Sequence, residues 1–216
     1  GRTSVSYSGY VAWDRTLKTL DMMTADELLS YAKTNNITQL NDYYNVDNPA
    51  NTNWQDEVLR TGFSHNHNVS INGGNEKTNY SASLNFQDRE GVVRGTNMDR
   101  LNARTFVQTK ALNNRLELAL SLNASIRNSS TGPTDIQGRS VLDAMYYYNP
   151  LVPVKNEDGT WYRNLNISQN YNPLSMINED RYDTKEKLLQ GKAQDTLHII
   201  DGLDWNLNLS YQNQQY

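Results

Sequence analysis

The sequence contains no cysteine and no long apolar run, and its charges nearly balance. Without cysteine there is no disulfide scaffold, thiolate metal site or cysteine nucleophile. No apolar stretch approaches the roughly 18 residues of a transmembrane helix, and none forms a signal peptide. Lys+Arg 20 against Asp+Glu 24 gives a net charge of -4, which argues against nucleic acid as a partner.

Apolar residues are also scarce for a chain of 216 residues. The hydrophobic share is 37% and the mean hydropathy is -0.79, whereas globular domains average about 45–50% apolar residues. Tyrosine, asparagine and serine take their place, and an aromatic share of 10% argues against disorder. The chain begins at Gly1 and ends at Tyr216 inside an expected strand, so we expect residues 1–216 to be one piece of a longer protein.

Strict alternation of apolar and polar residues predicts seven β-strands. The clearest case places Leu116, Leu118, Leu120 and Leu122 on one face. Helical spacing predicts short helices at 24–33 and 141–147, inside long connections that otherwise have the composition of loops. The expected strands cover residues 4–13, 62–72, 80–87, 99–110, 116–127, 188–200 and 203–216.

Two architectures could use such strands, a soluble β-sandwich or a transmembrane β-barrel. The strands exceed the soluble mode of about 5–6 residues and match the roughly 9–11 residues that span a bilayer. Connections alternate between long or medium (14–61, 88–98, 128–187) and short, as in outer-membrane barrels. We therefore predict an all-β, antiparallel transmembrane barrel with long extracellular loops that contain short helices. A secreted or surface β-sandwich that binds glycans or mediates adhesion is the alternative.

The barrel hypothesis assigns a direction to each strand face. The leucine face would contact lipid, with Trp13, Tyr80 and Trp205 near the strand ends as aromatic girdles. The side chains of a barrel of about eight strands already fill its interior. Seven strands with a polar lumen would therefore form an arc of a larger barrel. The predicted lumen-facing residues are Glu117, Asn123, Arg127, Asn206 and Asn208.

An aromatic cluster in the longest loop is the predicted substrate-binding site. Aromatic faces beside amide donors suit a sugar or a peptide, although the same rings could instead pack the loop against its neighbours. The cluster consists of Tyr146, Tyr147, Tyr148, Trp161 and Tyr162.

Other chemistry has weaker support. His65 and His67 share a strand face, but no third ligand is evident, so we expect no metal site. The sequence has no Ser-His-Asp order, phosphate loop or zinc motif. We therefore expect neither enzymatic activity nor a cofactor.

Three segments resemble one known family. They are NTNWQDEVLRTGFSHNHNVSINGGNEKTNYSASLNFQDREGVV at 51–93, VSYSGYVAW at 5–13 and DAMYYYNPLVPVKNEDGTWY at 143–162. These segments are similar to the barrel of SusC-like (SusC/RagA family) TonB-dependent outer-membrane transporters.

This resemblance implies a plugged barrel of roughly 22 strands, located in the bacterial outer membrane and surrounded by its lipid. It also implies active import of oligosaccharides or peptides with a SusD-like surface lipoprotein. Energy would come from the TonB-ExbB-ExbD system through an N-terminal part outside this chain. We expect the plug and the remaining strands to lie outside residues 1–216 as well.

Overall fold

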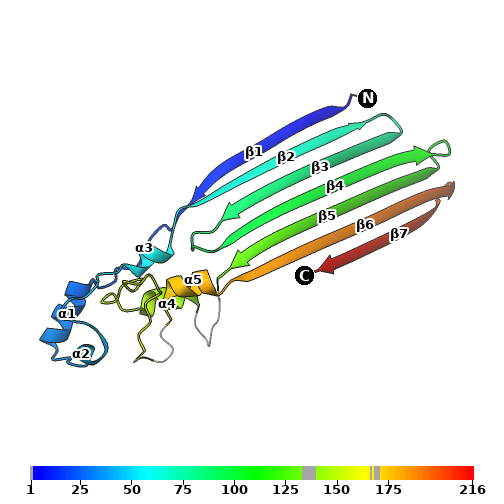
Figure 1. Ribbon diagram of the computed structural model, residues 1–216. Coiled ribbons are helices and arrows are strands. Elements are labelled where there is room, and N and C mark those ends of the chain that lie inside the picture. Colours follow the sequence, from blue (N-terminus) through cyan, green and yellow to red (C-terminus); the bar gives the residue numbers. More distant parts are fainter. Residues whose placement is uncertain (1, 133–139, 166, 168–170) are drawn as a thin grey trace.

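The computed structural model describes residues 2–132, 140–165, 167 and 171–216. Seven strands form one antiparallel sheet in chain order, from β1 to β7 (Figure 1). The number and order of strands agree with the alternation in the sequence. The strands are β1 Ser4–Asp14, β2 Gly62–Gly74, β3 Thr78–Glu90, β4 Asn97–Ala111, β5 Leu116–Thr131, β6 Tyr182–Ile200 and β7 Leu203–Gln215.

The helices of the described residues lie at one end of the sheet, and tight turns close the other end (Figure 1). In that part of the chain, the connection from β1 to β2 carries three helices, and the connection from β5 to β6 carries two. None of the helices in the described part of the chain has the length and apolar composition to cross a membrane. The helices are α1 Ala25–Thr34, α2 Leu40–Tyr43, α3 Trp54–Val58, α4 Val141–Tyr147 and α5 Pro173–Glu179.

The two predicted helices are confirmed as α1 and α4, and both begin with a capping box, at Thr24 and Ser140. The prediction of loop for α2, α3 and α5 was wrong. Asparagine caps α3 and α5, because the Asn53 and Asn172 side chains accept hydrogen bonds from the first-turn amides of these helices. Helices this short are marginal alone, so they depend on packing that periodicity does not record.

β5 and β6 extend further toward the loops than expected. β6 begins at Tyr182, six residues before the predicted start at 188, and β5 continues to Thr131. The added residues are polar on both faces, and so they lack the alternation that marks a strand. Cross-strand contacts replace that signal, as in the ion pair between Arg127 and Glu186 at 2.7 Å.

The strand register keeps apolar side chains on one continuous face. Leu120 lies opposite Val107 and Ala193, and Leu122 lies opposite Thr105 and Gly191. Leu120 is 57% exposed, and within the described residues no second sheet covers this face. A sandwich would bury these leucines, and the described residues contain no sheet that does so, which favours the barrel arc.

The buried apolar residues gather in the loops and leave the sheet without a core. Trp54 and Val58 of α3 pack with residues of α4 and α5. Loops that are about 90 residues apart in the sequence thus form one packed unit at the end of the sheet (Figure 1). Its other members are Val141, Ala144, Met145, Tyr148, Val152, Leu174, Met176 and Ile177.

Candidate functional site

The polar face of the sheet holds all five predicted lumen-facing residues. Asn123 and Arg127 alternate with the leucines of β5, as does Glu117. Thr196 lies opposite both Glu117 and Asn206, and Gln194 links Ala119 to Asn208 in the same way, so β5, β6 and β7 present these residues on one side. Lumen exposure of this face stays a prediction.

Amide side chains hydrogen-bond across four strands of this face. Asn102 Nδ2 donates to Asn123 Oδ1 at 2.9 Å, and Asn123 Nδ2 donates to Gln190 Oε1 at 3.0 Å. Gln190 Nε2 then donates to Gln212 Oε1 at 3.0 Å. Asn123 and Gln190 both donate and accept, because an amide group carries donors and an acceptor, so a row of amides forms hydrogen bonds without charge. This explains why asparagine and glutamine replace the lysine and glutamate of an ordinary solvent face.

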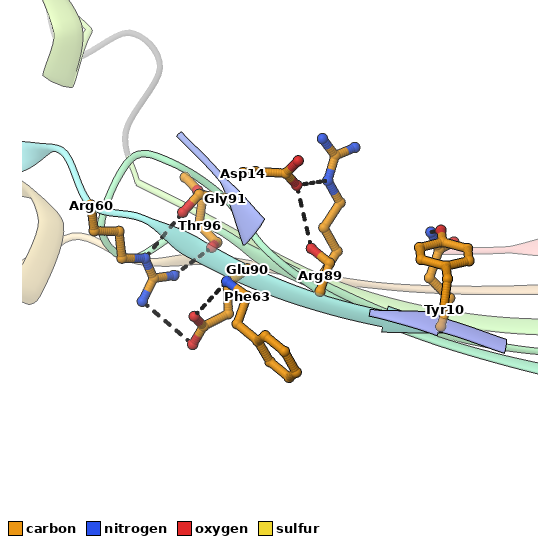
Figure 2. Close-up of polar contacts among 10 residues, drawn as sticks. Tyr10, Asp14, Arg60, Phe63, Arg89, Glu90, Gly91 and Thr96 are labelled. Carbon is orange, nitrogen blue, oxygen red and sulfur yellow. Dashed lines mark hydrogen bonds and ion pairs between the residues drawn. The ribbon is translucent and has the colours of Figure 1, made fainter. Parts of the chain in front are cut away.

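Charged residues on the polar face form ion pairs between neighbouring strands. Lys110 Nζ lies 2.8 Å from Glu117 Oε1, near the tight turns. At the loop end, Arg89 Nε lies 3.4 Å from Asp14 Oδ2. Figure 2 shows Asp14, Arg89 and Tyr10 on one side of the sheet and Phe63 on the other. The alternation of side chains is therefore maintained up to the loop end.

A second polar group lies on the opposite side of the same strand ends (Figure 2). Arg60 Nε donates to the carbonyl of Gly91, and one terminal nitrogen donates to the carbonyl of Thr96. Glu90 accepts from the Phe63 backbone amide at 3.2 Å and lies 3.6 Å from Arg60. These contacts tie the start of β2 to the turn between β3 and β4, next to the end of α3 at Val58.

Trp54 and Gln55, which begin the letters W-Q-D at 54–56 in the segment quoted above, join the two long loops. Trp54 is 4% exposed, and its Nε1 donates to the Asn149 carbonyl at 3.0 Å. Its ring meets Tyr148 edge to face at 4.8 Å between centroids. Gln55 accepts from the Leu20 amide at 2.8 Å and donates to the Leu20 carbonyl at 2.7 Å. We call these five residues the loop junction. The W-Q-D letters were visible in the sequence, but their structural role was not.

The structure spreads the five residues of the predicted aromatic cluster over different environments. Tyr148 is buried in the loop core, and burial raises the pKa of its phenol above the ordinary value. Tyr147 is 78% exposed, and Tyr146 and Tyr162 are half-buried. The half-buried Trp161 has Lys155 Nζ 4.4 Å from its ring centroid. Ligand binding by the cluster stays a prediction, and Tyr147 is the member best exposed for it.

Asn172 is a buried polar residue that sequence reasoning missed. Its Nδ2 donates to the Val154 carbonyl at 2.8 Å and to the Tyr162 carbonyl at 3.2 Å. Its Oδ1 accepts from the Leu174 and Ser175 amides at the start of α5. The signal was available, because asparagine before proline is typical of a helix start.

His65 and His67 lie on the apolar face, as their alternation predicts. Tyr7 Oη lies 2.7 Å from His67 Nδ1, and the two imidazole centroids are 5.2 Å apart. His65 Nδ1 is buried and has no hydrogen-bond partner in the described part of the chain. No group of three potential metal ligands occurs among the described residues.

Comparison with curated proteins finds TonB-dependent receptors. The TonB-dependent receptor SusC of Bacteroides thetaiotaomicron is 33% identical over 179 residues, which cover 78% of this chain and 17% of that protein. The TonB-dependent receptor P3 of Formosa agariphila is 25% identical over 201 residues, which cover 91% of this chain and 19% of that protein. This chain therefore spans less than a fifth of the length of these relatives. No family model matches the chain.

Solved structures show the same fold at low sequence identity. The RagAB peptide importer in its open-open state matches with a TM-score of 0.77 and 16% identity. Its closed-closed state matches with a TM-score of 0.73 and 17% identity. Each match covers 99% of this chain and 28% of the solved chain. The sheet and its helical loops thus share the fold of one part of a larger chain.

Proposed function

Because this chain belongs to the SusC-like family of TonB-dependent outer-membrane transporters, we propose that it forms part of the wall of an importer for oligosaccharides or peptides. The seven-stranded sheet is an arc of a bacterial outer-membrane β-barrel. The relatives are receptors and transporters and are not enzymes. In this assignment the whole protein imports nutrients, and residues 1–216 contribute wall and loops.

The two-faced sheet is the observation that supports import best. One face is apolar and exposed, with Leu120 and Leu122 available to lipid. The other face carries the amide rows and ion pairs of Asn123 and Arg127, which suit a wet lumen. A wall of this kind separates lipid from a path for polar cargo. In the proposal, Glu117, Asn206 and Asn208 line the same path.

Energy and a partner lipoprotein complete the proposal. The TonB-ExbB-ExbD system would act through parts of the full-length protein outside this chain. A SusD-like surface lipoprotein would cover the extracellular mouth and contact the loops. The connection from β1 to β2 exposes apolar side chains that such a lid could bury, namely Leu17, Leu20, Met22, Met23 and Tyr31.

The aromatic cluster remains the proposed cargo contact. Tyr147 would stack on a sugar ring or a peptide side chain, with Tyr146, Trp161 and Tyr162 beside it. Tyr148 would position this surface, because it lies in the loop core against Trp54.

Uptake by cells tests this function. A strain without the full-length gene and a complemented strain are given a pool of oligosaccharides and, separately, a pool of short peptides. We expect the complemented strain to deplete members of one pool, measured by mass spectrometry of the medium. An uncoupler should abolish depletion, because import depends on energy transmitted by TonB. Equal depletion by both strains would contradict import, and depletion that persists with the uncoupler would indicate a passive pore.

A further inference from the structure

A hollow with a volume of ≈ 730 Å³ lies over the middle of the polar face. Its charged and amide side chains and one phenyl ring come from β4 to β7, and they belong to adjacent rows of the register. They are Arg104, Phe106, Asn123, Gln190, Lys192 and Gln212.

Three other basic residues of the polar face form ion pairs, and Arg100 on the same face donates to the Gln87 side chain at 3.2 Å. Lys110, Arg89 and Arg127 each lie within 4.0 Å of a carboxylate. Among the described residues, neither Arg104 nor Lys192 has a carboxylate at ion-pair distance. No acidic residue lines the hollow in that part of the chain either. The hollow therefore carries two positive charges that the sheet itself does not neutralise.

The register places the two cations on either side of β5. Arg104 lies opposite Asn123, and Lys192 lies opposite Ser121, one row further toward the tight turns. Phe106 shares the row of Ser121 and Lys192 and is 38% exposed. A guanidinium and an ammonium beside amide groups suit a carboxylate, and the phenyl ring can cover its carbon chain.

We infer that this hollow binds a carboxylate group. The inference rests on the proposed function, because only inside a barrel is this face enclosed. The carboxylate has two possible sources, an acidic side chain of the full-length protein that fills the lumen, or the cargo itself. Low-dielectric walls around a wet lumen strengthen the attraction, since they reduce the screening of the charges relative to an open surface.

The test uses the full-length transporter in detergent and two matched double variants. The first combines Arg104→Gln with Lys192→Gln. The control combines Lys185→Gln with Lys187→Gln, which removes the same charge from the opposite face of β6. Heat-dependent gel mobility confirms that each barrel is folded. A third variant, Arg104→Lys with Lys192→Arg, keeps both charges and should restore the wild-type result.

Two measurements separate the sources. If the protein supplies the carboxylate, the first variant melts at a lower temperature than both the wild type and the control without any ligand, and high salt removes the difference. If cargo supplies it, the melting temperatures agree, but affinity for a triglutamate peptide falls at least about tenfold by calorimetry. Triglutamine then binds both variants equally.

Equal melting temperatures together with equal triglutamate affinity would overturn the inference. The charge-retaining variant must restore whichever of the two quantities changed, the melting temperature or the triglutamate affinity. If it does not, the inference is also overturned, because the effect would then reflect packing. Uptake by cells is a separate measurement, so intact uptake with a negative result here leaves the proposed function in place.

Discussion

Replacing Leu122 by arginine is expected to destabilise the full-length barrel by about 2–4 kcal/mol, the cost of a cation on the lipid face near the bilayer midplane. Leu122 is 48% exposed on the apolar face and lies midway along β5. Its guanidinium would have to remain in hydrocarbon or pull water toward it. Urea unfolding of the full-length protein in lipid vesicles measures the loss.

Ser125→Arg provides the control, because Ser125 lies on the polar face of the same strand, opposite Asn102 and Leu188. We expect this variant to lie within about 1 kcal/mol of wild type, since lumen-facing charges remain hydrated. A cost for Ser125→Arg that equals or exceeds the cost for Leu122→Arg would contradict the assignment of the two faces.

Replacing Trp54 by alanine is expected to release the packed loops and leave the strands intact. The substitution removes a buried indole, and such losses cost about 3–5 kcal/mol. It also removes the hydrogen bond to the Asn149 carbonyl and the ring contact with Tyr148. Hydrogen exchange of the full-length protein should show faster exchange in α3 and α4, with unchanged protection in β3 to β6.

Two further variants separate packing from size alone. Trp54→Phe keeps a ring against Tyr148 but loses the indole donor, so we expect a cost of about 1 kcal/mol. Tyr147→Ala removes a ring of similar kind that is 78% exposed, and it should leave loop exchange unchanged. Equal exchange in Trp54→Ala and wild type would mean that the loop junction does not hold the loops together.

The strands could be predicted from the sequence because two different environments act on each of them. Apolar and polar positions alternate where one face of a strand contacts lipid and the other contacts water, as at Leu120 and Ser121. The short connections then indicated which strands are neighbours, and the structure added the register. The five residues predicted to share the polar face do so because a period of two leaves no other placement.

The loops could not be predicted to the same depth, because their structure depends on contacts between distant segments. Trp54 donates to the Asn149 carbonyl, 95 residues further along the chain. The buried Asn172 side chain donates to the Val154 carbonyl, 18 residues before it. Neither contact leaves a periodic pattern. The same reason explains the aromatic cluster, where Tyr148 is buried and its neighbour Tyr147 is exposed.

The central claim is that one face of the sheet contacts lipid and the other faces a wet lumen. Spin labels at single cysteines along residues 116–127 of the full-length protein in bilayers test it directly, and this chain has no cysteine of its own. Oxygen, which enters lipid, should relax labels at the even positions such as 118, 120 and 122. A water-soluble nickel chelate should relax labels at the odd positions 117, 121 and 123. Equal access of the nickel chelate to both sets, or the opposite alternation, would contradict the account.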